Sequence, residues 1–547
     1  MSLRIKLLNY FRSRDRGFIL SLFAATCLLY LPFLGNPFMF DDMNLFGGEL
    51  ATHYAYSSFH FDLRWLPYAS LGWTSLLFSK EVTHLYHLFN LLLHVANVIL
   101  LFYLLRRVMS AAIPEHSDSS AVVWGAWSGA LIFALHPAAT YAVGYVVERS
   151  IVMATLFSLI MVLAYLHGLL TGKVGWLIVA AVAYFLAVFS KEHSVLMPAM
   201  LAAMTILLRA KIKIGKRDFW LVWGVFSLIG LLIIMRAAGV FGIPYEPMAA
   251  ALFEQQRVYQ NAPMLHLLSI LTQAGLYFKY LLLWLLPNPA WLSIDMRESF
   301  VPSLAAWQGW LGGAAFILYG FVGARLLLRG GIKGVLGLAL LSPWLQFLLE
   351  FSTIRVQEPF VLYRSYLWMP GLMLLIPLSF IGWPRRALLV SGVVVMLLAA
   401  GAANRLWVFA DNYRLWNDAA MLLPNERSPG ADRIFFNRGQ AEEKLGKWDD
   451  AIADFERSLA VSPQYASVHS ALAWQYLRSN RIDEAMVHFE TAIACDPSYA
   501  AAYVGKAMVL KRRNDLKQSS EYLAKSCELG NQMACLMTKG HVENPSN

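Results

Sequence analysis

The sequence predicts an all-α protein, a bundle of about 11 to 12 membrane-spanning helices followed by a domain of helical repeats. The 547 residues are 58% hydrophobic and only 15% charged, with a mean hydropathy of +0.51, which is too apolar for an ordinary soluble protein. The cations behind the net charge of +10 cluster in short loops between apolar runs, as in membrane proteins and unlike a nucleic-acid-binding surface. After residue 403 the chain becomes polar and helix-forming, which predicts a second domain.

The first apolar run, roughly 17–35, follows a cluster of cations and is the first predicted membrane helix. A signal peptide has the same order of charges, but this run is long for one and lacks a small-residue cleavage site. We therefore expect an uncleaved helix whose N-terminus lies in the cytoplasm.

Eleven further runs have spanning length: 84–105, 119–136, 150–170, 174–190, 193–208, 218–238, 264–287, 306–328, 334–350, 362–381 and 385–403. If every run crossed, the cations near Arg329 and Arg385 would lie outside, against the usual placement of positive loops in the cytoplasm. If 264–287 is instead a re-entrant or surface-lying helix, both groups of cations lie on the cytoplasmic side. The predicted outer loops are then 36–83, 137–149, 191–193, 239–305 and 351–361, and the chain after 403 lies outside.

The C-terminal part repeats with a period of 34 residues, as the prolines at 429, 463 and 497 show. Small residues recur at Gly439, Ala473 and Ala507, and Phe455 and Phe489 share another position. This period with this small/aromatic pattern is the tetratricopeptide signature, which predicts an α-solenoid with a concave surface for a peptide or partner. We expect a membrane domain over 1–405, a linker helix over 406–429 and about three repeats in 430–547. The three cysteines of the last region show no metal-ligand spacing and no obvious pairing.

Asp41 and Asp42 lie side by side in the first outer loop. The simplest interpretation is a turn capped by two solvated carboxylates. Alternatively, such a pair can deprotonate a hydroxyl. It could also hold a divalent cation through oxygen ligands, although no metal-specific cluster supports this and we expect no metal-ligating residues.

Further ionisable side chains gather at the outer ends of the predicted spans, where they are costly unless paired or functional. They are His136, Glu148, Arg149, Lys191, Glu192, His193, Arg355, Glu358 and Arg364, with Tyr366 beside the last. Singly, each reads as an interfacial anchor. Together they suit group transfer from a lipid-phosphate donor, because the leaving phosphate needs Arg or Lys and the acceptor hydroxyl needs a carboxylate base.

These features, in this order along the chain, resemble the transmembrane-and-tetratricopeptide-repeat O-mannosyltransferase family of the GT-C glycosyltransferase superfamily. The resemblance implies a GT-C membrane domain with an outward-facing active site and a polyprenyl-phosphate-linked sugar as donor. By position it makes Asp41 or Asp42 the base, with Asp42 favoured, and Glu148 a second acid. It makes Arg149, Lys191 and Arg364 donor-phosphate ligands. Arg355 is a further candidate phosphate ligand from its place among the outer ionisable groups, and His136, Glu192, His193, Glu358 and Tyr366 are candidate substrate contacts. The chain departs from the family at Glu148-Arg149-Ser150, where relatives tend to show Gly-Arg-Ala-Asp.

The predicted function is therefore an inverting glycosyltransferase of the bacterial inner membrane. It would transfer a sugar from polyprenyl phosphate to a hydroxyl of an exported protein such as a pilin, with the repeats in the periplasm presenting the acceptor. One alternative is a lipopolysaccharide or other envelope glycan as acceptor. The non-enzymatic alternatives are a membrane scaffold whose repeats bind partners, or a transporter, although a transporter should carry ionisable groups near mid-span.

Overall fold

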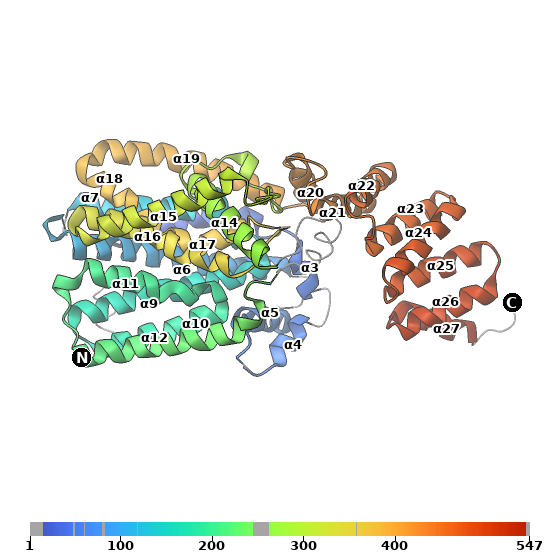
Figure 1. Cartoon of the computed structure of the whole chain (residues 1–547), viewed down its shortest axis with the longest axis horizontal. Coiled ribbons are helices and arrows are strands. Elements are labelled where there is room, and N and C mark those ends of the chain that lie inside the picture. Colours follow the sequence, from blue (N-terminus) through green and yellow to red (C-terminus); the bar gives the residue numbers. More distant parts are fainter. Residues whose placement is uncertain are drawn as a thin grey trace. The chain divides into compact units, whose positions relative to one another are not determined.

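The structure is a computed structural model that describes residues 15–46, 50–59, 61–78, 82–116, 119–243, 262–356 and 358–542. Its chain divides into two compact units, both built from helices (Figure 1). The first, here called the membrane unit, comprises Met1–Ile294 and Phe300–Asp411, and the second, the repeat unit, comprises Asp295–Ser299 and Asn412–Asn547. The predicted boundary at 405/406 falls inside a helix that continues to Val408.

The long helices of the membrane unit correspond to the apolar runs of the sequence. They are α2 (Arg16–Tyr30), α6 (Thr83–Ala112), α7 (Ser120–Ala134), α9 (Arg149–Thr171), α10 (Val174–Ser190), α11 (Met197–Leu207), α12 (Lys216–Ala237), α14 (Ala262–Leu285), α15 (Trp307–Leu328), α16 (Gly331–Phe347) and α19 (Pro384–Val408). Shorter helices connect them: α3 (Asp41–Phe46), α4 (Leu50–Tyr56), α5 (Trp65–Phe78), α8 (Pro137–Val143), α17 (Ser365–Trp368) and α18 (Leu375–Gly382). Short 3-10 helices include η4 (Val146–Glu148), η5 (Glu192–Leu196), η9 (Leu348–Ser352) and η11 (Met369–Leu374). Within the described residues, nine helical segments are long and apolar enough to cross a membrane, which indicates a multi-pass membrane protein.

Three of the predicted spans are not single straight helices of spanning length in the structure. The run at 119–136 ends at Ala134 and continues after a 60° bend as α8, because His136 caps the new helix through its Nδ1 and Pro137 starts it. The runs at 174–190 and 193–208 form helical segments that are short for a crossing. If α7 and α8 make one broken span, the described residues contain up to ten crossings.

Cations in the loops between the apolar runs contact neighbouring segments. Arg106 pairs with Asp15 at 2.7 Å, and the ammonium of Lys211 donates to the carbonyl of Ala111. The N–H of Lys213 donates to the carbonyl of Leu169 at 2.9 Å. These contacts fit the assignment of these loops to a single side of the membrane.

Helix α14 covers the predicted non-spanning run, although by length and composition it could span. Along its length its side chains reach the segment 351–365, from His266 Nε2 at the carbonyl of Phe351 (2.7 Å) to Trp284 Nε1 on Ser365 Oγ (2.9 Å). Both ends of α14 therefore contact the segment 351–365, which contains one loop and the start of the next predicted span. The re-entrant or surface-lying placement of this helix stays a prediction.

Small residues let α15 and α16 approach closely. A Cβ at Gly337 in α16 would lie 2.3 Å from the backbone nitrogen of Leu327 in α15, and one at Gly320 would lie 2.4 Å from the ring of Trp344. Such close packing supplies the association energy that the hydrophobic effect cannot supply between helices in lipid.

The repeat unit contains α20 (Asn412–Met421) and three helical pairs followed by α27 (Gln532–Val542). The pairs are α21 (Ala431–Lys444) with α22 (Trp448–Val461), α23 (Ala466–Arg478) with α24 (Ile482–Cys495), and α25 (Ala500–Arg512) with α26 (Leu516–Glu528). The repeated small residues face the repeated phenylalanines, because a Cβ at Gly439 would come within 2.7 Å of the Phe455 ring. Phe455 and Phe489 are fully buried, so the 34-residue pattern is the core of a solenoid.

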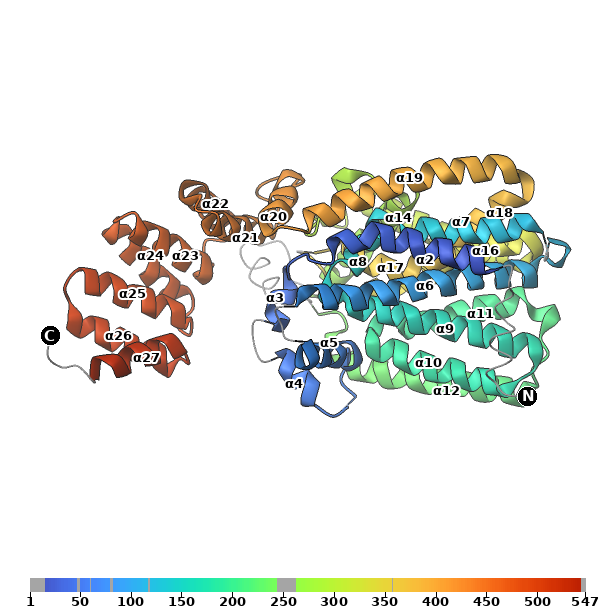
Figure 2. The ribbon, with the colours of Figure 1, turned by 180° about the vertical axis from the view of Figure 1, so that it is seen from behind.

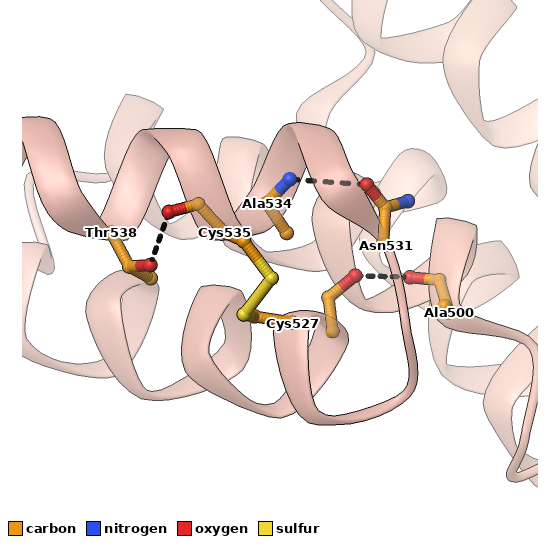
Figure 3. The surroundings of a disulfide bond; sticks show 7 residues. Ala500, Cys527, Asn531, Ala534, Cys535 and Thr538 are labelled. Carbon is orange, nitrogen blue, oxygen red and sulfur yellow. Dashed lines mark hydrogen bonds between the residues drawn. A yellow bond between two sulfur atoms is a disulfide. The ribbon is translucent and has the colours of Figure 1, made fainter.

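The structure pairs two of the cysteines that the sequence left unpaired. Cys527 at the end of α26 and Cys535 in α27 form a disulfide across an eight-residue separation (Figure 3). Disulfides persist in oxidising compartments such as the periplasm.

A short piece of the predicted outer loop 239–305 belongs to the repeat unit. Asp295 accepts from Arg297 at 2.6 Å and pairs with Arg433 of α21 at 2.9 Å. This piece of the predicted outer loop is therefore in contact with the first helical pair of the repeats.

Candidate active site

The two aspartates of the first loop occupy different environments. Asp42 is fully buried, and its carboxylate accepts the N–H of Val147 at 2.7 Å and that of Met39 at 3.3 Å. Asp41 is exposed, and its own N–H donates to the Tyr145 hydroxyl at 2.8 Å. The residue before them, Phe40, has a φ of 52°, a conformation that costs energy for a bulky side chain and is found most often at functional sites.

Burial raises the pKa of Asp42 to about 8, against the opposing effect of the backbone N–H donors of Val147, Met39 and Val146. The negative charge of Asp41 raises it further. Because Asp42 is enclosed and fully used in backbone contacts, the geometry favours Asp41, rather than the preferred Asp42, as the acid that a substrate can reach.

Tyr145 connects the aspartates to the other candidate residues. Burial raises its pKa well above the ordinary value, and the charges of Asp41, Asp42 and Glu148 add to the shift. Its ring lies 6.3 Å from that of Tyr363, whose hydroxyl is in turn under the influence of Glu148, Arg364 and Glu358. The acids predicted from distant parts of the chain thus surround two tyrosines.

Glu148 forms a buried ion pair with Lys191. The Lys191 ammonium donates to Glu148 Oε2 at 3.1 Å and to Ser150 Oγ at 3.2 Å, and it lies 5.2 Å from the centre of the Tyr363 ring. Burial, followed by the positive charge of Arg64, lowers the pKa of Lys191, and Glu148 opposes that change. This pairing fits the chain's departure from the family pattern at Glu148, since the acid provides the lysine with a counterion.

Arg149 is 2% exposed and sits among neutral acceptors. Its guanidinium donates to Asn90 Oδ1 at 2.9 Å, to the hydroxyls of Ser70 and Thr74 at 3.3 and 3.2 Å, and to the carbonyl of Tyr86 at 3.2 Å. These contacts tie α5 and α6 to the start of α9. Its predicted phosphate-binding role stays a prediction, and the contacts describe a positioning residue.

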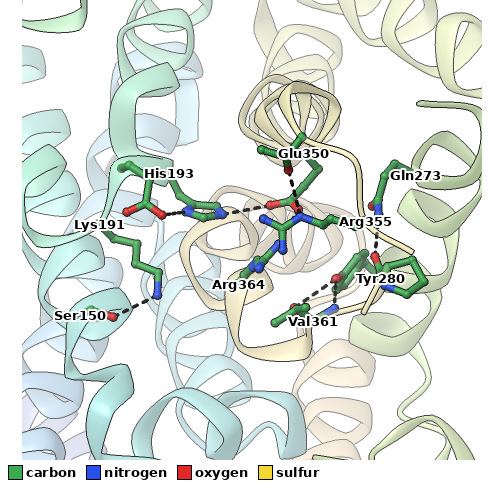
Figure 4. Close-up of polar contacts among 12 residues, drawn as sticks. Ser150, Lys191, His193, Gln273, Tyr280, Glu350, Arg355, Val361 and Arg364 are labelled. Carbon is green, nitrogen blue, oxygen red and sulfur yellow. Dashed lines mark hydrogen bonds and ion pairs between the residues drawn. The ribbon is translucent and has the colours of Figure 1, made fainter. Parts of the chain in front are cut away.

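A chain of buried ionic contacts runs from His193 through Glu350 to Arg364 (Figure 4), and Glu192 adjoins it at His193. Glu192 receives both a 2.9 Å hydrogen bond and a second, shorter one from the Arg64 guanidinium, and it lies 3.5 Å from His193 Nδ1. His193 Nε2 contacts Glu350 Oε1 at 3.1 Å. Arg64 has a φ of 64°, a second strained position beside the candidate residues.

Glu350 closes this network and was not foreseen from the sequence. Its Oε2 accepts from Arg364 at 2.7 Å and pairs with Arg355 at 3.4 Å, while the carboxylate is only 3% exposed. The signal was its position, since it is the one acid at the end of the apolar run 334–350. Arg64, on the first outer loop, gave no signal of its own.

The ionic network, defined as these paired groups, contains four Arg and Lys side chains and three carboxylates, joined by His193. Its members are Arg64, Glu148, Lys191, Glu192, His193, Glu350, Arg355 and Arg364. Guanidinium and ammonium groups in such surroundings attract a phosphate.

The remaining candidates lie around the network or deeper in the bundle. The Tyr366 hydroxyl contacts His94 Nδ1 at 2.6 Å and accepts from Asn97 at 3.1 Å, inside the helices. His136 stacks on Trp284 with ring centres 4.3 Å apart. Glu358 is half-buried. The described residues hold no cluster of three or more His, Cys, Asp or Glu side chains suited to a metal ion, and we derive no step through one.

A cavity of about 520 Å³, here called the network cavity, lies beside the ionic network. Glu192, His193 and Arg355 supply its polar wall. The opposite wall is apolar and comes from the end of α12 and from η7 (Ala238–Val240), with Ile233, Ile234, Ala237 and Phe241. The cavity thus has one polar wall and one apolar wall.

Comparisons with known proteins identify the repeats. A family model of the tetratricopeptide repeat matches residues 436–500, so the chain contains a tetratricopeptide repeat region. No curated protein matches the chain.

Solved structures with local similarity include tetratricopeptide proteins. The first tetratricopeptide domain of Spaghetti (RPAP3), bound to an HSP90 peptide, is 20% identical and covers 20% of this chain and 90% of its own, with a TM-score of 0.20. YrrB, described as having an unusual peptide-binding site, is 18% identical and covers 31% and 91%, with a TM-score of 0.22. The Cut9–Hcn1 structure is 12% identical and covers 91% and 90%, with a TM-score of 0.22. Scores this low carry no argument about the arrangement of the whole chain.

Proposed function

We propose that the protein is an integral membrane glycosyltransferase that moves a sugar from a polyprenyl-phosphate donor to a hydroxyl of an exported protein. The observation that carries the proposal is the convergence of Asp41, Tyr363 and the ionic network at one end of the helices, next to the network cavity. The resemblance to GT-C O-mannosyltransferases supports the same assignment.

The donor lipid would lie with its prenyl chain along the apolar wall formed by α12 and η7. Its phosphate would then reach Arg355, which lines the cavity and is already fixed by Glu350 at 3.4 Å. The Arg and Lys side chains of the network supply the attraction, and the buried setting strengthens it relative to water.

The reaction would be a single displacement. Asp41 takes the proton of the acceptor hydroxyl while the hydroxyl oxygen bonds to C1 of the sugar. The bond between C1 and the phosphate oxygen breaks, and its electron pair leaves with polyprenyl phosphate, whose developing charge the nearby cations stabilise. Attack opposite the leaving group inverts the configuration at C1. Asp42 holds the loop by its two backbone contacts, and so it positions Asp41.

The repeat unit would bring the acceptor. Tetratricopeptide arrays form concave surfaces that bind peptides or partner proteins. The disulfide between Cys527 and Cys535 supports a position for this unit outside the cytoplasm, where exported acceptors are found.

The test is transfer activity in membranes that contain the donor lipid. We expect Asp41→Asn to lower transfer by about 10² to 10⁴-fold, the usual contribution of a general base, with unchanged expression. Glu115→Gln is the matched control, because Glu115 is an exposed carboxylate on a loop at the opposite end of the helices. Full transfer by Asp41→Asn would refute the proposal. Mass spectrometry of exported proteins and of envelope lipids from a deletion strain separates a protein acceptor from a glycan acceptor.

A further inference from the structure

A second, larger cavity lies on another side of the membrane unit. It has a volume of about 810 Å³ and is here called the α19 groove. One wall is α19 from Arg386 to Arg405, and the other comes from η11, α18 and the segment that follows α14. Helices α12 and α19 lie at opposite edges of the bundle (Figures 1 and 2), so the groove is separate from the network cavity.

The α19 groove runs along nearly the whole thickness of a membrane. From Arg386 to Arg405 there are 19 helical steps, which at 1.5 Å each give about 28 Å. The hydrocarbon core of a bilayer is about 30 Å thick, and a phospholipid chain occupies half of it. A single chain that fills this groove must be longer than a phospholipid tail.

The groove is also open to the lipid side of the bundle and apolar along its middle. Val390 and Leu397 line it and are 61% and 69% exposed, as expected for residues that face lipid. Ser391 supplies the polar atom nearest the middle of the helix, while Leu398 and Val394 continue the apolar lining.

The groove has a cation at each end of α19, Arg386 at its start and Arg405 at its outer end. Asn288, Asn404 and Arg405 line that end. The Arg405 guanidinium is held in place, because it donates to the carbonyl of Leu292 at 2.7 Å and to Asn404 Oδ1 at 2.6 Å. A fixed cation with amides beside it suits a phosphate headgroup.

We infer that the α19 groove binds a second polyprenyl-phosphate lipid, with its phosphate at Arg405 and its prenyl chain along α19. The long apolar channel matches a chain that exceeds one leaflet, and the cation at its end matches the charge of the head. The inference goes beyond the proposed function, which uses the network cavity alone.

The experiment measures lipid bound to the full chain by native mass spectrometry after reconstitution with polyprenyl phosphate. We expect two lipids on the unaltered protein. Val394→Trp fills the groove and should remove one, lowering affinity for it at least tenfold. Val393→Trp is the matched control, because its neighbouring side chain is 54% exposed and does not line the groove, and it should keep both.

Further variants locate the headgroup and separate this inference from the proposed function. Arg355→Gln should remove the lipid of the network cavity and leave that of the α19 groove. If Asp41→Asn keeps full transfer while Val394→Trp still loses one lipid, the proposed function fails and this inference stands. Arg386→Gln should leave both lipids bound, and loss of the groove lipid in that variant would overturn the orientation.

A photoreactive polyprenyl phosphate tests the unaltered protein, so the result does not depend on whether Val394→Trp folds. We expect crosslinks on peptides of α19 between Arg386 and Arg405. Equal lipid occupancy in Val394→Trp and Val393→Trp, crosslinks confined to α12, or displacement of the probe by ordinary phospholipid would each overturn the inference.

Discussion

Replacement of Glu350 by Gln is the sharpest test of the ionic network, because this one carboxylate serves three partners. It accepts from Arg364 at 2.7 Å, contacts His193 Nε2 at 3.1 Å and pairs with Arg355 at 3.4 Å. The substitution keeps the size of the side chain and removes its charge. Two guanidinium groups that are each about 5% exposed then lose a shared counterion.

The magnitude follows from the burial of these groups. Removing one partner of a buried ion pair costs about 3–5 kcal/mol, since the other charge stays desolvated without compensation. For a chain of this size each kcal/mol lowers the melting temperature by roughly 1 °C, so we expect a decrease of about 3–5 °C. The assay is thermal unfolding of the purified full chain in detergent.

Two further variants make the result interpretable. Glu115→Gln removes an exposed carboxylate and should leave the melting temperature unchanged. The double variant Glu350→Gln, Arg364→Gln removes one of the stranded cations and should recover part of the loss. A melting temperature of Glu350→Gln equal to that of the unaltered protein would refute the reasoning that charge pairing stabilises this end of the bundle.

Three more predictions concern single groups. The pKa of Asp42 is raised from 3.8 to about 8, so between these values the native state binds a proton that the unfolded state releases. The stability of the membrane unit should therefore fall as the pH rises from about 4 to about 8, and Asp42→Asn should flatten the profile of melting temperature against pH. The pKa of His488 is lowered from 6.5 by burial and by His469, so the unfolded state binds a proton that the native state does not. The stability of the repeat unit should therefore fall as the pH drops below about 6.5. A His488→Gln variant whose stability falls with pH as steeply as that of the unaltered protein would contradict this. Cys527→Ser removes the disulfide to Cys535 and should destabilise the repeat unit by about 2–3 kcal/mol on a loop-closure estimate, measured by thermal unfolding with the reduced unaltered protein as a control.

Sequence reasoning was most effective where a single periodic signal determined the structure. Apolar runs of spanning length became helices, and the 34-residue pattern gave helical pairs with Phe455 and Phe489 in their core. The prediction was wrong at the run 119–136, because this one apolar stretch contains the start of a second helix after a 60° bend. The capping histidine and the proline after it carried that information, but an apolar average does not register them.

The residues of the candidate site could be named from the sequence, but the ion pairs that they form with one another could not. Placing acids and cations at the outer ends of spans followed from charge and topology. Which acid neutralises which cation depends on packing among helices far apart in the sequence, as in the contact of Lys191 with Glu148. For the same reason Glu350 was overlooked, and the exposed Asp41 could not be told from the buried Asp42.

The hydrogen bond between Asp42 and the turn before α9 limits the motion of the neighbouring Asp41. One hydrogen bond from the Val147 N–H to Asp42 and another from the Asp41 N–H to Tyr145 join a surface loop to the buried interior. A carboxylate on a free loop would lose conformational entropy each time it engaged a hydroxyl. Here that entropy is lost once, when the chain folds, so the exposed carboxylate is held in one orientation.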